Sequence, residues 1–217
     1  MNRYKAVLFD LDGTLAMTME DNFKAWMAAL LEYGVEIDFE YYYLLEGLRL
    51  YEIASRLAEK FHLKDIDAKD IVESKEKYYL DNHQFALYPG VEELITLLNS
   101  RNVPIAIVTA GLENRLKSSV PSEFLEKFDS IITGDGTAEG KPSPVPYLRA
   151  AEKLGIEPEH CIAVENAPLG IESAKNAETY CVAICSTLNK RYLEKADEIL
   201  DSFECLKDSK AIRQLLG

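Results

Sequence analysis

The chain of 217 residues is long enough for one α/β domain with a small addition, and it needs no disulfide or metal to stabilise a core. Hydrophobic residues make up 47% and charged residues 28% of the sequence, which excludes a disordered tail, a collagen-like repeat and a fibrous chain. The formal net charge of -13 argues against nucleic acid as a partner, because phosphate backbones are bound by clustered lysine and arginine.

No apolar run reaches the ~20 residues that a membrane-spanning helix requires, so we expect no membrane partner. The first residues lead into a strand-like run without the apolar stretch and cleavage site of a secretory signal, which favours the cytoplasm. The cysteines have neither CxxC spacing nor histidine partners and are interpreted as reduced core residues. We expect a monomer or weak dimer.

The first predicted element is a short strand over residues 6–9, which is followed directly by Asp10. The interval from about residue 15 to residue 87 contains no convincing strand and predicts helices only. The first of these helices is expected to begin at a cap formed by Thr18 and Asp21 and to stop at Gly34. Further helices are predicted over residues 50–61 and 68–82, the latter with Ile71, Lys75 and Tyr78 on one face.

From residue 88 onward, helical patterns alternate with short runs that are apolar on both faces, which is typical of a parallel sheet covered by helices. The predicted strands are residues 104–108, 130–132, 161–164 and 179–184, and the predicted helices include 89–99 and 145–154. We therefore predict an α/β fold, a doubly wound parallel sheet, with a small all-helical cap domain inserted after the first strand. The core domain would comprise residues 1–15 and 88–217, and the cap residues 16–87.

Polar residues follow several of these strands. Asp10 and Asp12 come after the first strand, Thr109 after the second, Lys141 in the loop after the third, and Glu165 with Asn166 after the fourth. In an open α/β sheet ligands bind at this edge, where the carboxyl ends of the strands meet. Carboxylates, a hydroxyl and a lysine suit a site for a divalent metal and a phosphoryl group.

The motifs Asp10-Leu11-Asp12-Gly13-Thr14, Thr109, Lys141 and Glu165-Asn166 occur in the order of the four motifs of the haloacid-dehalogenase (HAD) superfamily, which this sequence resembles over its whole length. The predicted helical cap lies where that family places one. The segment 165–171 is similar to the β-phosphoglucomutase-like and phosphoglycolate-phosphatase-like branch.

The resemblance implies phosphoryl transfer through an aspartyl phosphate. Asp10 would be the nucleophile and Asp12 the acid and base, with the pKa of Asp12 raised toward the working pH. Thr109 and Lys141 would also be catalytic and would bind phosphate with Ala110 and Gly111. Magnesium would be held by Asp10, Asp12 through its main-chain carbonyl, Glu165 and Asn166.

Two positions depart from the family pattern. Asn166 stands where aspartate is usual, which predicts weaker magnesium binding, and Gly111-Leu112-Glu113 stands where β-phosphoglucomutases have a lysine and an asparagine. Arg49 of the cap is a candidate for substrate binding.

The favoured function is a magnesium-dependent phosphatase of a small phosphorylated metabolite such as a sugar phosphate. A phosphoglucomutase is the alternative, and a non-catalytic phosphate-binding protein is a third.

Overall fold

The computed structural model describes residues 3–217, and within them six parallel strands form one sheet in the order β3-β2-β1-β4-β5-β6. The strands are β1 (Ala6–Phe9), β2 (Ile105–Val108), β3 (Ser130–Ile132), β4 (Cys161–Glu165), β5 (Tyr180–Ile184) and β6 (Glu198–Leu200). The first strand is central, and the chain winds outward from it on both sides, so the predicted doubly wound α/β fold is confirmed.

The central strands are apolar on both faces because helices cover both sides of the sheet. Val7 and Phe9 of β1 belong to a hydrophobic cluster on one face, whereas Ala6 and Leu8 belong to the cluster on the other. This alternation follows from the two-residue period of a strand. The register is continuous across the middle of the sheet, where β1 pairs with both β2 and β4.

Most helices of the core connect successive strands, and the last ones follow β6. They are α5 (Val91–Ser100), α6 (Glu113–Ser119), α7 (Ser122–Leu125), α8 (Val145–Leu154), α9 (Pro168–Asn176) and α10 (Lys210–Leu216), with short 3-10 helices η1 (Pro158–His160), η2 (Lys190–Tyr192) and η3 (Phe203–Asp208). Apolar residues of α5 and α10 join the cluster of Val7 and Phe9, and those of α8 and α9 join the cluster of Ala6 and Leu8.

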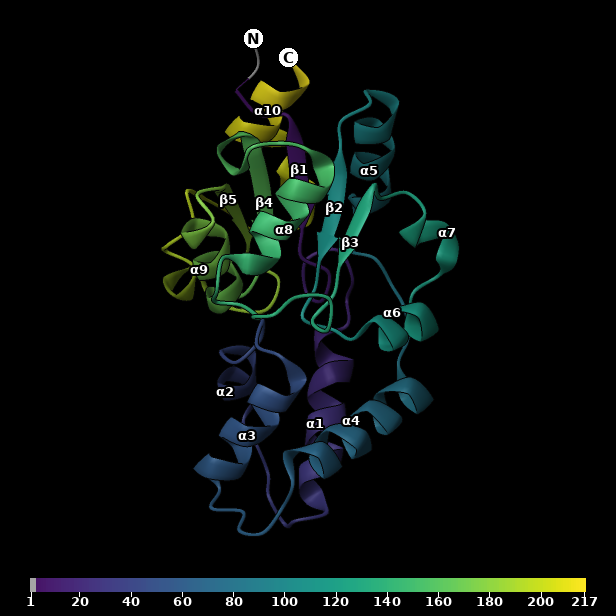
Figure 1. The fold of residues 1–217 in the computed structure, drawn as a ribbon, viewed down its shortest axis with the longest axis vertical. Helices are drawn as coiled ribbons and strands as arrows, with labels where there is room; N and C mark the ends of the chain where they lie inside the picture. The colour runs from purple at the N-terminus through teal and green to yellow at the C-terminus, as the bar shows by residue number, and fades with distance from the viewer. Residues whose placement is uncertain (1–2) are drawn as a thin grey trace.

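Four helices between β1 and β2 form the cap, namely α1 (Met19–Leu31), α2 (Phe39–Tyr43), α3 (Leu50–Lys60) and α4 (Ala68–Asn82). They lie together at the end of the sheet toward which the strands point (Figure 1). A third hydrophobic cluster, centred on Trp26, Tyr42 and Leu57, belongs mainly to these helices. The cap helices therefore share a hydrophobic cluster of their own. The division of the chain at residues 16 and 87 stays a prediction.

Several local predictions are wrong. Thr18 occupies the N-cap position of α1, but no side chain caps that helix, because the Thr18 hydroxyl donates to Asp12 and Asp21 accepts from the Gln84 amide. In α4 it is Tyr79, 1% exposed, and not Tyr78, 38% exposed, that faces the core. The short helix α2 and the edge strand β6 were not predicted, since a helix of five residues shows little periodicity and β6 lacks the continuous apolar run of the buried strands.

All four cysteines are free, as expected, but only Cys161 and Cys181 are buried in the core, whereas Cys185 and Cys205 are partly exposed. Within residues 3–217, none of the helices combines the length and the apolar composition that crossing a bilayer requires.

Candidate active site

The topology brings the predicted polar residues to one edge of the sheet. Asp10 follows β1, Thr109 follows β2 and Glu165 ends β4, and these three strands are neighbours. Lys141 comes from the loop after β3, at the same edge. Gly13 has a φ of 85° in the turn after Asp12, and a Cβ atom there would lie 2.2 Å from the Asn166 amide nitrogen.

Lys141 lies between two buried carboxylates. Its Nζ donates to Oδ1 of Asp10 at 2.7 Å and to Oε1 of Glu165 at 2.6 Å. The lysine is 2% exposed. Burial alone would lower the pKa of Lys141, but the charges and hydrogen bonds of the two carboxylates raise it, so the ammonium form is held. The arrangement is a fixed positive charge directly beside Asp10.

One carboxylate oxygen of Asp10 is left without a partner. Oδ2 of Asp10 is buried and accepts no hydrogen bond from any described residue. Burial raises the pKa of Asp10 to about 7, while the charge of Lys141 opposes this rise and Glu165 adds to it. An unpartnered anionic oxygen of this kind fits a cation, whose charge would favour the ionised carboxylate.

The other predicted metal ligands are engaged differently. Glu165 accepts from Lys141 and the Tyr147 hydroxyl on Oε1, and from the main-chain amides of Asn166 and Ala167 on Oε2. Both oxygens of Glu165 are therefore used in holding the site together, and its predicted role as a metal ligand stays a prediction.

Asn166 accepts from the Thr14 hydroxyl at 3.1 Å and donates to Thr187 at 3.1 Å. Within residues 3–217 no three His, Cys, Asp or Glu side chains are grouped closely enough to hold a metal ion. A magnesium ion here would need Asp10, amide or main-chain oxygens, water and substrate oxygens, a donor set that this ion accepts.

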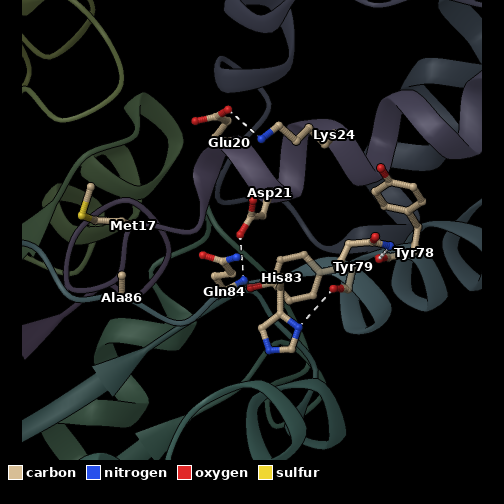
Figure 2. A pocket seen from close by; sticks show the side chains of 10 residues that line it. Met17, Glu20, Asp21, Lys24, Tyr78, Tyr79, His83, Gln84 and Ala86 are labelled. Atoms are coloured by element: carbon tan, nitrogen blue, oxygen red, sulfur yellow. Dashed lines mark hydrogen bonds and ion pairs between the residues drawn. The ribbon is translucent and has the colours of Figure 1, made fainter.

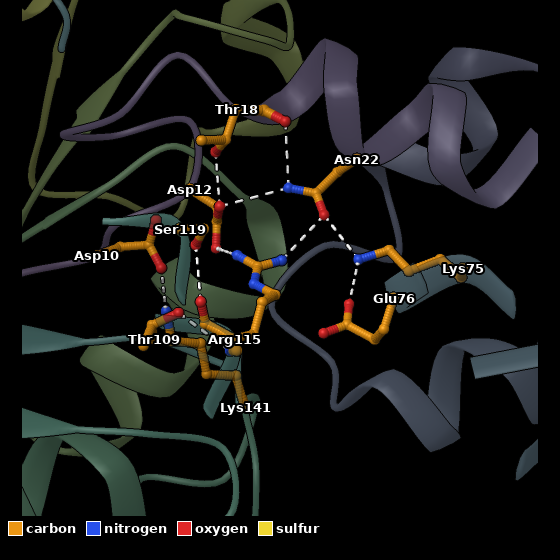
Figure 3. Close-up of polar contacts among 11 residues, drawn as sticks. Asp10, Asp12, Thr18, Asn22, Lys75, Glu76, Thr109, Arg115, Ser119 and Lys141 are labelled. Carbon is orange, nitrogen blue, oxygen red and sulfur yellow. Dashed lines mark hydrogen bonds and ion pairs between the residues drawn. The ribbon is translucent and has the colours of Figure 1, made fainter. Parts of the chain in front are cut away.

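Asp12 is held by residues of both the core and the cap (Figure 3). Arg115 of α6 donates to Oδ2 at 2.6 Å, and Thr18 and Asn22 donate to Oδ1 at 2.6 and 3.3 Å. Burial would raise the pKa of Asp12, but the Arg115 charge, the Thr18 hydrogen bond and the Lys75 charge together lower it. The prediction of a raised pKa for Asp12 is therefore wrong for this closed arrangement.

A second shared contact connects Arg115 to the cap. Asn22 of α1 accepts on Oδ1 both from Arg115 at 3.0 Å and from Lys75 of α4 at 2.8 Å. Lys75 is fully buried and pairs with Glu76 at 2.7 Å. Sequence reasoning missed Asn22 and gave Lys75 no function, although a lysine on the apolar face of a helix was the available signal.

Thr109, Ala110 and Gly111 form the loop after β2. The Thr109 hydroxyl accepts from the Gly111 amide at 3.0 Å. Thr109 and Ala110 line a cavity of about 20 Å³ with Asp10, Asp12, Glu46, Gly47, Asn166 and Ala167. Gly47 of the cap, with a φ of 94°, lies directly over Lys141, since a Cβ atom there would be 3.4 Å from its Cδ. The cap is thus closed over the site.

Arg49 does not line this cavity. It precedes α3, and its guanidinium donates to the main-chain oxygen of Thr137, in the loop before Lys141. Its Nε is buried without a partner among the described residues. The structure therefore places Arg49 between cap and core, and its substrate contact stays a prediction.

A larger cavity of about 490 Å³ lies where α1 and α4 meet the segments that join cap and core (Figure 2). None of the predicted site residues lines it. Its charged groups are already paired, since Glu20 contacts Lys24 at 2.7 Å and Asp21 accepts from the Gln84 amide. The chemistry therefore points to the smaller site at the sheet edge.

Comparison with known proteins shows what this chain is similar to. The sequence model of the haloacid dehalogenase-like hydrolase family matches residues 7–184. The chain is 31% identical to validoxylamine A 7'-phosphate phosphatase of Streptomyces hygroscopicus subsp. limoneus, over 91% of this chain and 93% of that protein. It is 36% identical to phosphoglycolate phosphatase of Aquifex aeolicus, over 81% and 82% of the two chains.

Among solved structures, the fold is similar to β-phosphoglucomutase from Clostridium difficile, with a TM-score of 0.83 and 26% identity, covering 98% of this chain and 97% of that one.

Proposed function

Because this chain belongs to the haloacid dehalogenase-like hydrolase family, we propose that this phosphoric monoester hydrolase is a magnesium-dependent phosphatase of small phosphorylated metabolites. It would act through an aspartyl phosphate on Asp10, in the cytoplasm and as a monomer or weak dimer. The observation that carries the proposal is the unpartnered Asp10 oxygen beside the Lys141 ammonium.

Asp10 is the nucleophile of the proposed reaction. One of its oxygens forms a bond to phosphorus while the bond from phosphorus to the leaving oxygen breaks. Lys141, held 2.7 Å from Asp10, stabilises the negative charge on the carboxylate and on the transferring group. Thr109 and the amides of the following loop donate to phosphoryl oxygens.

Asp12 moves the protons. Its protonated form gives a proton to the leaving oxygen, and the carboxylate then accepts a proton from the water that attacks phosphorus as the bond to Asp10 breaks. The Arg115 contact favours the carboxylate, which suits the second step. Protonation for the first step requires the contacts of Asp12 to loosen. Opening of the cap would remove the hydrogen bonds from Asn22 and Thr18, because both residues belong to the cap side, and would leave Arg115 without its Asn22 partner.

Magnesium, when bound, would neutralise charge between the nucleophile and the phosphoryl group and so permit two anions to approach. Asp10, the Asp12 main-chain carbonyl and Asn166 are the residues that would hold it, and Glu165 would take part only after giving up hydrogen bonds.

The relatives support hydrolysis, since two of them are named as phosphatases of phosphorylated small molecules. A phosphosugar mutase of the β-phosphoglucomutase type is the second candidate, supported by the likeness of the folds. The two activities differ in whether water or a sugar hydroxyl attacks the aspartyl phosphate.

The test is phosphate release from a panel of phosphomonoesters, with magnesium and with a chelator, by the wild type and by Asp10→Asn. The proposal predicts release that needs magnesium and falls by at least about 10³-fold in Asp10→Asn, because the nucleophile is lost. The exposed variant Asp70→Asn should retain wild-type release. Sugar isomerisation without release would favour the mutase, and binding without turnover would contradict both enzymatic functions.

A further inference from the structure

A second small cavity lies between cap and core, beside the site already described. It is lined on the core side by Asp12, Ala110, Gly111 and Arg115, and on the cap side by Asn22, Trp26, Tyr42, Glu46, Leu48, Leu50 and Ile53. Asp12, Glu46 and Ala110 also line the cavity next to Asp10. The second cavity therefore adjoins the first at Asp12, the residue proposed to give a proton to the leaving group.

Three polar groups at this cavity have no protein partner. The indole nitrogen of Trp26 and Nε of Arg115 are buried donors without an acceptor among the described residues. The Glu46 carboxyl makes no hydrogen bond or ion pair with any residue of the described range 3–217. Buried polar groups are costly to leave unpaired, so the two buried donors, beside the partly buried Glu46 carboxyl at the same cavity, indicate a bound molecule.

One side of the cavity is apolar. Leu48, Leu50 and Ile53 are each at most 6% exposed and form one wall, with Tyr42 beside them. A compact group with a carbon skeleton and hydroxyls would meet apolar contacts on one side and hydrogen-bonding partners on the other.

The charges near the cavity do not favour a second anion. Arg115 is paired with Asp12 and Lys75 with Glu76, so the two cations are already matched. Glu46 is the additional carboxyl. Burial, and then the charge of Asp12, raises the pKa of Glu46 to about 8, against the lowering effect of Lys75 and Arg115. A carboxylate or second phosphate brought here would find no unpaired cation, since Arg115 and Lys75 are already matched and a protonated Glu46 supplies no positive charge.

We infer that Trp26, Glu46 and Arg115 form a leaving-group pocket that selects an uncharged, hydroxyl-bearing leaving group over one carrying a second anionic group. This inference rests on the proposed phosphatase function and adds the residues that set its specificity. Arg115 Nε and the Trp26 indole donate to hydroxyl oxygens, and Glu46 accepts from a hydroxyl.

The cavity is too small to admit a leaving group while the cap is closed. At about 20 Å³ it holds about one water molecule, so a leaving group enters only when the cap moves away from the core. The cap residues Trp26 and Glu46 then reach the leaving group as the cap closes, and recognition is coupled to closure.

The experiment compares kcat/KM for glycerol phosphate and phosphoglycolate, two small phosphomonoesters whose leaving groups carry hydroxyls or a carboxylate. Each value is divided by the kcat/KM of the same variant for p-nitrophenyl phosphate, whose leaving group carries no hydroxyls to recognise, so that partial misfolding cancels. The variants are Glu46→Gln and Trp26→Phe, with Glu52→Gln, an exposed carboxylate of the same cap, as the control.

The inference predicts that the wild type and Glu52→Gln prefer glycerol phosphate, and that Glu46→Gln and Trp26→Phe each reduce this preference by about tenfold. An unchanged preference in both pocket variants, or a wild type that prefers phosphoglycolate, would overturn the inference while leaving the phosphatase function intact. Failure of the wild type to release phosphate from all three compounds would overturn the proposed function and this inference with it.

Discussion

The guanidinium of Arg115 lies 2.6 Å from Oδ2 of Asp12, and the same side chain donates at 3.0 Å to Asn22 of the cap. Arg115 is 6% exposed and stacks over the Tyr79 ring at 4.6 Å. Since Tyr79 and Asn22 both belong to cap helices, the orientation of Asp12 is tied to the position of the cap. Opening of the cap would remove Asn22 and Tyr79, two of the groups that hold the Asp12 and Arg115 side chains.

Replacement of Arg115 by methionine should lower kcat for phosphate release by about 10²-fold, because Asp12 loses the group that orients it for proton transfer. Arg115→Lys should recover part of this loss, since it keeps a positive charge. The control is Arg149→Met, which removes an exposed arginine paired with Glu152. Steady-state kinetics on one phosphomonoester measures the effect, and a wild-type kcat in Arg115→Met would contradict it.

Removal of the Lys141 charge should destabilise the fold as well as abolish turnover. Lys141→Met leaves Asp10 and Glu165 buried without their shared cation, which should lower the free energy of unfolding by about 3–5 kcal/mol. Urea unfolding measures this change. Lys117→Met, which breaks an exposed pair with Glu113, should alter stability by no more than about 0.5 kcal/mol. Equal effects of the two substitutions would show that the buried pairs do not matter.

Asn166→Asp should strengthen magnesium binding by about tenfold, because it adds one negative charge to the proposed ligand set. The substitution suits the site, since the Thr14 hydroxyl already donates to Oδ1 of residue 166 and the Thr187 hydroxyl can turn to donate. Calorimetric titration with magnesium measures the dissociation constant. Asn114→Asp adds the same charge at an exposed position and serves as the control. Equal affinity in wild type and Asn166→Asp would place residue 166 away from the ion.

The pH dependence of stability should report on Glu46. Its pKa is raised from 4.5 to about 8 in the folded state, so the folded chain keeps a proton that the unfolded chain releases between these values. The unfolded state then binds fewer protons, and the free energy of unfolding falls as pH rises through this window. Glu46→Gln does not titrate and should show a smaller fall between pH about 5 and about 8.

Urea unfolding at the two pH values measures that difference. The surface variant Glu52→Gln is the control, because it shows how far the free energy of unfolding falls with pH in a protein that retains Glu46. A decline in Glu46→Gln as steep as that of the control would contradict the assignment of Glu46 as a carboxyl that holds its proton in the folded state.

The sheet was predictable because its central strands are apolar on both faces. The runs at 130–132 and 161–164 match β3 and nearly all of β4, and the prediction of 68–82 coincides with α4. The strand β6 lies at the sheet edge, is only half-buried and begins with Glu198, so its sequence resembles a loop.

The candidate site was predictable only where its residues follow strands. Asp10, Thr109 and Lys141 belong to short motifs that can be recognised in the sequence, and the parallel sheet brings these residues together. The contacts of Asn22, Glu46 and Thr18 at the site depend on how the cap closes over the core, and no local sequence pattern predicts that closure. Thr18 shows the difficulty, since the same residue type signals a helix cap and a hydrogen-bond donor to Asp12.

The most direct test of the account is to trap the proposed covalent intermediate by rapid acid quench during turnover with magnesium, followed by mass spectrometry of the peptide that contains Asp10. The account predicts one added phosphoryl group on Asp10 in the wild type and none in Asp10→Asn. Rapid turnover in which the phosphoryl group is never found on Asp10, or undiminished phosphate release by Asp10→Asn, would contradict it.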